Sequence, residues 1–183
     1  TFDKITQAET REYFPQLREV LERVSAAYLL LELVDRFLEE HDENPLLYDL
    51  LLHALGWLDQ GEPPALVLRF FVVKMLGYVG YQPQLFDCQV CGASLEPVDQ
   101  FFGIAEGGAI CPRCAEPGAA SMSLSALKVL RLMQSGDWGV VRRLRLDDTL
   151  RDELERLLHP YISFHLERDL KATKFVEQVR HLE

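Results

Sequence analysis

Four cysteines constrain the fold of this chain more than any other feature. They form two Cys-x-x-Cys pairs, Cys88/Cys91 and Cys111/Cys114, which are separated by nineteen residues and contain every cysteine of the chain. Two residues between thiolates let both sulfurs of a pair face one ion, so two such turns supply a closed tetrahedral site. The pattern predicts one structural zinc ion, because no coordination position remains for water or substrate.

Other uses of paired cysteines are weaker interpretations. No secretion signal is visible at the N-terminus, and thiols stay reduced in the cytosol, so disulfides are disfavoured and a cytoplasmic location is expected. A redox Cys-x-x-Cys would be expected near a βαβ pattern, and the sequence predicts none. An iron site uses similar turns, and the sequence alone does not separate iron from zinc.

The segment around the cysteines predicts a small ribbon. Gly92 follows the first pair, where a tight turn favours positive φ. Short strands are expected over 101–104 and 109–110, joined by a hairpin turn at 106–108. Ala115 stands where the second turn also favours glycine. We predict an inserted zinc ribbon over 85–119.

The remainder of the chain predicts a helical bundle, so the fold class is mainly α. Residues 65–79 are apolar on nearly every side, which predicts a helix at the centre of the body. A capping box at Thr6 and Glu9 predicts a short first helix. Helices are expected over about 7–13, 15–40, 45–60, 65–79, 123–134, 147–166 and 173–182.

The helix at 15–40 has apolar residues at helical spacing. This pattern predicts the face that the helix turns toward the core. The face comprises Leu17, Val20, Leu21, Val24, Tyr28, Leu31, Val34 and Leu38.

Charge is unevenly distributed along the chain. The net charge is −10 overall and −9 over residues 1–64 alone. Residues 128–145 carry +4, from Lys128, Arg131, Arg142, Arg143 and Arg145 against one aspartate. An acidic body does not coat nucleic acid over its whole surface, but this distribution permits one basic face.

No catalytic motif is visible. The glycines form neither a phosphate-binding loop nor a dinucleotide-binding turn. No histidine stands at motif spacing from a cysteine, serine or carboxylate, so we do not expect an enzyme. The five histidines are His41, His53, His159, His165 and His181.

Several stretches in order resemble the bacterial recombination mediator family RecO, in particular its Deinococcus type. One residue departs from the family pattern: Ala172 follows Lys171, where the family commonly has serine. The matching stretches are Ala27–Leu33, Leu76–Tyr78, Pro83, Cys88–Gly92, Phe102, Gly107–Gly108, Cys111–Cys114, His165–Lys171 and Lys174–Val176.

The resemblance implies three parts: an N-terminal OB barrel, a helical domain and a zinc ribbon inserted into that domain. We expect the barrel to be absent from this chain, with residues 1–6 as the end of its last strand. The helical domain is expected over 7–84 and 120–183.

The resemblance also implies a function without catalytic turnover. The family binds single- and double-stranded DNA and anneals complementary strands. With RecR and RecF it loads RecA onto DNA coated by single-strand-binding protein, whose acidic C-terminal tail it also binds. We predict that Arg142, Arg143, Arg145, Lys171 and Lys174 contribute a surface for DNA phosphate or for this tail.

Without the resemblance, two functions remain open. One is an accessory protein of nucleic-acid processing with a structural zinc ribbon. The other is a protein–protein adaptor or transcriptional regulator that uses the acidic helical surface. A zinc-stabilised enzyme is a distant third.

Overall fold

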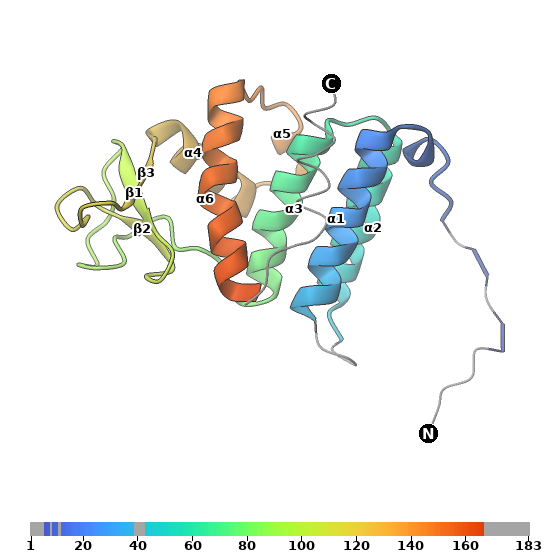
Figure 1. Cartoon of the computed structure of the whole chain (residues 1–183), viewed down its shortest axis with the longest axis horizontal. Helices are drawn as coiled ribbons and strands as arrows, with labels where there is room; N and C mark the ends of the chain where they lie inside the picture. The colour runs from blue at the N-terminus through green and yellow to red at the C-terminus, as the bar shows by residue number, and fades with distance from the viewer. Residues whose placement is uncertain (1–5, 8, 11, 39–42, 167–183) are drawn as a thin grey trace.

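The computed structural model describes residues 6–7, 9–10, 12–38 and 43–166 (Figure 1). A helical body carries a small three-stranded sheet at one end. The elements in chain order are η1 (Leu17–Glu19), α1 (Leu21–Phe37), α2 (Pro45–Asp59), α3 (Pro64–Tyr78), β1 (Gln100–Gly103), β2 (Gly108–Ile110), β3 (Ala120–Met122), α4 (Leu124–Ser135), α5 (Trp138–Val141) and α6 (Asp148–Leu166).

Helix α3 lies at the centre of the body, as its all-round apolar sequence predicts. It contacts α1, α2 and α4, and its side chains from Leu66 to Val73 are all buried. Pro64 starts the helix at a position where the missing N–H costs no hydrogen bond. The buried Arg69 forms an ion pair with Glu155 of α6. The mainly helical fold class is therefore confirmed.

The predicted core face of α1 is confirmed in part and wrong in part. Leu17 is buried, and Val24, Val34 and Leu38 are partly buried against the core. Tyr28 is 64% exposed and Leu21 is 58% exposed, whereas the helix buries Ala26, Leu30 and Leu33. Small alanines let α1 approach the body closely, and this close packing overrides the more conspicuous spacing of larger residues. Helix α1 thus keeps an apolar outer face.

Three predictions about element boundaries also need correction. The described residues between Thr6 and Phe14 are not helical, because a cap alone cannot stabilise a helix without tertiary packing. Helix α1 begins at Leu21 after the separate turn η1, later than the predicted start at 15. The region after Gly136, where no helix is predicted, contains the short helix α5. The predicted helix at 173–182 lies outside the described residues.

The sheet has the order β2-β1-β3, with antiparallel pairing throughout. The predicted hairpin is confirmed, since Phe101 pairs with Ile110 and Phe102 pairs with Ala109. Strand β3 was not predicted. It has only three residues and lacks a marked alternation of apolar and polar side chains.

The two faces of the sheet contact different parts of the molecule because successive strand residues point to opposite sides. Phe102 and Ala109 join the main hydrophobic core, and the Phe102 ring lies 5.4 Å from that of Tyr161 in α6. Phe101 and Ile110 instead pack around the cysteines. The sheet thus separates the helical core from the cysteine cluster.

The length and hydropathy of the helices decide whether any of them could span a membrane. Across the described ranges, none is both long enough and apolar enough to cross a bilayer.

Candidate functional site: a four-cysteine cluster and a cationic pocket

The structure brings all four predicted cysteines together. Their sulfurs lie within 4.8 Å of one another, and the Cys91 and Cys111 sulfurs are 3.9 Å apart. A tetrahedral site with Zn–S bonds of about 2.3 Å has sulfurs about 3.8 Å apart. Cys88 and Cys111 are buried, whereas Cys91 is exposed. The arrangement can therefore hold a metal ion with cysteine sulfurs alone.

Local backbone geometry orients the first pair. Gly92 has φ +71°, and its N–H donates to the Cys88 carbonyl at 2.8 Å, which closes a tight turn around the pair. The Cys111 N–H donates to the Cys88 sulfur at 3.3 Å. Glycine fits this turn because positive φ is unfavourable for residues with a Cβ atom.

Ala115 closes the second turn through its backbone. Its N–H donates to the Cys111 carbonyl at 3.2 Å, and the Cys114 N–H donates to the same carbonyl at 3.0 Å. These hydrogen bonds form a helical turn, which any residue can adopt. The second turn therefore forms with alanine at position 115, where glycine was expected.

The thiols influence one another's ionisation. Burial opposes ionisation of Cys88, but backbone N–H groups, that of Cys111 first, lower the pKa of this thiol to about 6. Contacts with the thiols of Cys111 and Cys91 raise the pKa of Cys114 to about 12. Four thiolates at these distances repel one another, and a bound cation removes that repulsion. The donor set thus fits a soft divalent cation.

A group of polar contacts fixes the segment before the cysteines to the body. The Arg131 guanidinium of α4 donates to the Leu85 carbonyl through Nε at 2.9 Å and through an Nη atom at 2.6 Å. It also lies 4.7 Å from the centre of the Phe86 ring. Gln134 of the same helix donates to the Pro83 carbonyl at 2.7 Å. Arg131 therefore positions the ribbon rather than extending the basic surface.

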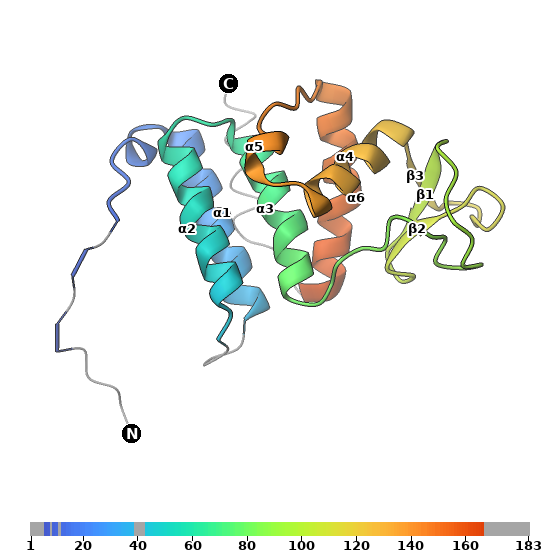
Figure 2. The ribbon, with the colours of Figure 1, turned by 180° about the vertical axis from the view of Figure 1, so that it is seen from behind.

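Three of the five predicted binding cations lie together. Arg142, Arg143 and Arg145 line a pocket of about 470 Å³ with Gly139 and Glu62. Arg142 forms an ion pair with Glu62, which comes from the connection between α2 and α3. Helix α5 lies beside this connection (Figure 2).

A second pocket of about 190 Å³ adjoins the first through Arg145. Its apolar lining comprises Pro63, Ala65, Leu66, Leu144 and Leu146, and Arg151 completes it. Arg145 thus borders both a polar and an apolar recess.

The other two predicted cations, Lys171 and Lys174, lie outside the described residues. The described residues thus place three of the five predicted cations, those at the pocket.

The chain matches the family model described as "Recombination protein O C terminal" over residues 18–174. It belongs to the RecO family. It is 40% identical over 180 residues to the "DNA repair protein RecO" of Roseiflexus sp. (strain RS-1), a match that covers 97% of this chain and 64% of that protein.

Two further relatives with the RecO name carry the same description. The protein of Desulforamulus reducens (strain ATCC BAA-1160 / DSM 100696 / MI-1) is 35% identical over 179 residues, covering 97% of this chain and 70% of the relative. The protein of Symbiobacterium thermophilum (strain DSM 24528 / JCM 14929 / IAM 14863 / T) is 36% identical over 187 residues, covering 98% and 73%. The chain therefore spans about two thirds of these RecO proteins.

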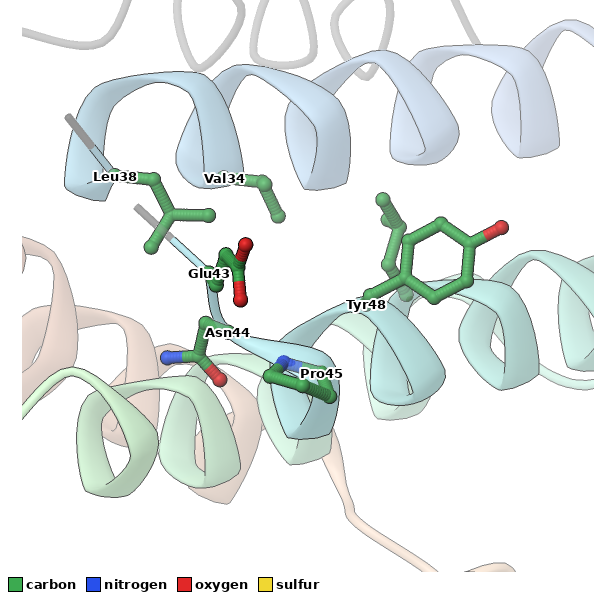
Figure 3. Close-up of a pocket in the computed structure, with 7 residues that line it drawn as sticks. Val34, Leu38, Glu43, Asn44, Pro45 and Tyr48 are labelled. Atoms are coloured by element: carbon green, nitrogen blue, oxygen red, sulfur yellow. The ribbon is translucent and has the colours of Figure 1, made fainter. Parts of the chain in front are cut away.

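This RecO-family chain also has an apolar groove between α1 and α2, which its sequence did not predict. Figure 3 shows Val34 and Leu38 extending from α1 and Tyr48 from α2, with Glu43 beside them. The groove has a volume of about 410 Å³. Tyr48 is 61% exposed. The helical spacing of the apolar residues of α1 predicts a core face and gives no sign of a groove.

Two of the described histidines, His53 and His165, contact neighbouring backbone or rings. His53 Nδ1 lies 2.7 Å from the Asp49 carbonyl, and the His165 ring stacks on Tyr81 with centroids 4.3 Å apart. In the described part of the chain, the four cysteines alone form a cluster of potential metal ligands. His41 and His181 lie outside that part.

Proposed function

We propose that this chain is the helical and metal-binding part of a recombination mediator that acts in DNA repair. The observation that carries this proposal is the family match over residues 18–174, together with relatives named "DNA repair protein RecO". The complete protein binds single- and double-stranded DNA and anneals complementary strands. It acts without catalytic turnover, in the cytoplasm.

The proposed partners are RecR, RecF, RecA and single-strand-binding protein. With RecR and RecF, the mediator loads RecA onto DNA coated by single-strand-binding protein. The proposed division of the chain has an OB-barrel remnant at 1–6, a helical domain at 7–84 and 120–183, and the ribbon at 85–119. Because the chain spans 64% of its Roseiflexus relative, the barrel would supply much of the remaining length.

The cysteine cluster would hold one structural zinc ion through Cys88, Cys91, Cys111 and Cys114. The sulfur distances and the absence of non-sulfur ligands in the cluster support this role. Zinc would keep the ribbon folded and take no part in a reaction. Metal analysis should find about one zinc per chain in protein purified under reducing conditions without chelator. Less than half an equivalent, or an iron content that matches the protein, would contradict the assignment.

The pocket of Arg142, Arg143 and Arg145 would bind DNA phosphate or the acidic tail of single-strand-binding protein, with Lys171 and Lys174 contributing from beyond α6. Arginine suits both ligands because its planar guanidinium donates to two oxygens at once. The adjoining apolar recess supports the tail in particular.

Charge reversal tests this surface. Replacing Arg143 and Arg145 with glutamate should weaken binding of single-stranded DNA or of the acidic tail and should reduce the salt dependence, because each lost phosphate contact lowers that dependence. Arg113→Glu, on the ribbon, is the matched control for each single substitution, Arg143→Glu or Arg145→Glu. If affinities and salt slopes stay unchanged in the double variant, the pocket is an ordinary solvated face.

Annealing tests the mediator function itself. The complete gene product should anneal complementary oligonucleotides. Binding of RecR should be measured for the complete protein and for this chain. Failure of both annealing and RecR binding would contradict the proposal. Retention of protein ligands without salt-dependent DNA binding would instead favour the adaptor or regulator.

A further inference from the structure

We infer that Glu62 is a built-in competitor in the cationic pocket, a carboxylate of the chain itself that holds Arg142 until an acidic peptide displaces it. The inference rests on the proposed binding role of this pocket. It assigns a specificity-determining role to an acidic residue among three arginines.

Glu62 is held firmly by the backbone at the end of α2. The Glu62 N–H donates to the Trp57 carbonyl at 3.0 Å, and the Gly61 N–H donates to the Leu58 carbonyl at 3.1 Å. Gly61 has φ +86°. Together with these two hydrogen bonds, it forms a glycine-terminated helix end that reverses the chain. Pro63 follows and fixes the exit of the chain. The Glu62 side chain is 13% exposed.

Arg142 is positioned just as firmly. The Trp138 ring of α5 stacks on Trp57 of α2 with centroids 4.4 Å apart. The Arg142 N–H donates to the Trp138 carbonyl at 2.9 Å. The carboxylate and the guanidinium are thus brought together by helices that are packed against each other, and their pairing is part of the fold.

The pair can nevertheless exchange partners. The Arg142 side chain is 53% exposed, so a ligand can reach its guanidinium from solvent. Ion pairs with solvent access contribute little to stability, and their partners exchange at low cost. Arg143 and Arg145 are also exposed, and with Glu62 in place the four charged groups that line the pocket carry a net charge of +2.

The lining favours an acidic peptide over nucleic acid. The pocket already accommodates one carboxylate, that of Glu62. Arg145 also borders the apolar recess, whose side chains include Leu66 and Leu146. A peptide with an apolar side chain next to its carboxylates can use both recesses, whereas a phosphate backbone uses the arginines alone. Glu62 therefore occupies the position of one ligand carboxylate.

Glu62→Gln tests the inference because glutamine keeps the shape of the side chain and removes its charge. The probe is a fluorescent peptide of consecutive aspartates followed by leucine, and a single-stranded oligonucleotide is measured in parallel. The variant should bind the peptide about three- to fivefold more tightly, with a steeper salt dependence, since a surface ion pair has this order of strength. Glu106→Gln, in the turn between β1 and β2, controls for the change in net charge and should leave the affinity unchanged.

A double-mutant cycle locates the effect. If Glu62 acts by occupying Arg142, the gain from Glu62→Gln should disappear in an Arg142→Gln background. Thermal unfolding of each variant checks that the fold is intact. Equal or weaker peptide binding by a folded Glu62→Gln protein, or an equal gain from Glu106→Gln, overturns the inference. A gain for the oligonucleotide alone overturns the assignment of an acidic peptide.

These measurements distinguish a wrong role for Glu62 from a wrong assignment of the pocket as a binding site. If Arg143→Glu and Arg145→Glu abolish peptide binding while Glu62→Gln changes nothing, the pocket is a binding site and Glu62 is only a structural ion-pair partner. If none of these substitutions changes binding, the pocket itself is not the site.

Discussion

The helical body and the cysteine ribbon are stabilised by different means. The body buries a continuous set of large side chains, among them Phe71, Leu30 and Tyr161, around the central helix α3. The ribbon has a separate small cluster in which Cys88, Ile110 and Cys111 are the buried members. So few apolar side chains cannot offset the conformational entropy of folding. The comparison teaches that hydrophobic burial stabilises the body and the sheet face that carries Phe102 and Ala109, whereas the segment around the cysteines would depend on the proposed metal ion.

Removal of the metal gives the largest expected difference between the two regions. Structural zinc contributes about 10 kcal/mol or more to the folding of small zinc domains. Chelation, or Cys111→Ser, should therefore abolish amide-exchange protection between Cys88 and Cys114 while α1, α2 and α3 stay protected. Exchange measured by mass spectrometry checks this, and added zinc should restore protection to the chelated protein. Loss of the helices together with the ribbon would show that the two regions fold as one unit.

Truncation of a core side chain should destabilise the body and leave the ribbon's metal site intact. Phe71 is completely buried in α3, so Phe71→Ala should lower the free energy of unfolding of the body by about 3–5 kcal/mol. Urea unfolding followed by helical circular dichroism measures the change. Tyr28→Ala, on the exposed face of α1, is the control and should change it by less than about 0.5 kcal/mol. Loss of bound metal from a still folded Phe71→Ala protein would contradict the separation of the two regions.

The connection between the regions should give a smaller effect. Arg131→Lys keeps the charge but loses the paired donation to the Leu85 carbonyl and the stacking on Phe86. Hydrogen bonds from charged groups contribute about 1.5–3 kcal/mol, and lysine should retain part of this. Exchange at residues 84–88 should therefore quicken about tenfold, with zinc content unchanged. Lys128→Arg, an exposed change on the same helix, should have no effect. Equal exchange in both variants would mean that Arg131 does not fix the ribbon.

The smallest predicted effect is a pH dependence confined to the body. Burial lowers the pKa of His165 below its ordinary value of 6.5. Unfolding exposes the ring and lets it bind a proton, so stability should fall as the pH drops below about 6.5. Urea unfolding at pH 7.5 and 5.5 measures the loss, which should be smaller in His165→Gln. The same loss in both proteins would assign the dependence to other groups.

Strong local patterns predicted the parts of the fold that depend on one dominant interaction. Helix α3 is apolar on nearly every side, and a central position in the body buries its side chains from Leu66 to Val73. The cysteine spacing identified the residues that cluster, because two short turns leave few other arrangements. In both cases the sequence pattern and the tertiary environment impose the same requirement.

Predictions failed where the outcome depends on tertiary contacts that the local sequence does not specify. Helix α1 has large apolar residues on two sides, and the side that it buries also carries the small residues Ala26 and Ala27 beside Leu30. Strand β3 forms because β1 offers it an edge, a requirement that its own three residues do not reveal. The pairing of Arg142 with Glu62 joins residues far apart in the chain, so spacing alone could not predict it.

The two-sided sheet affects how this chain can vary during evolution. Phe102 lies against the helices, whereas its neighbour Phe101 lies against the cysteines. Constraints on β1 should therefore alternate from one position to the next. A lineage that lost its cysteines would be released from the constraint at Phe101 and would still be held to an aromatic or similarly large residue at Phe102. Metal binding can thus disappear from such a protein without loss of the surface that closes its helical core.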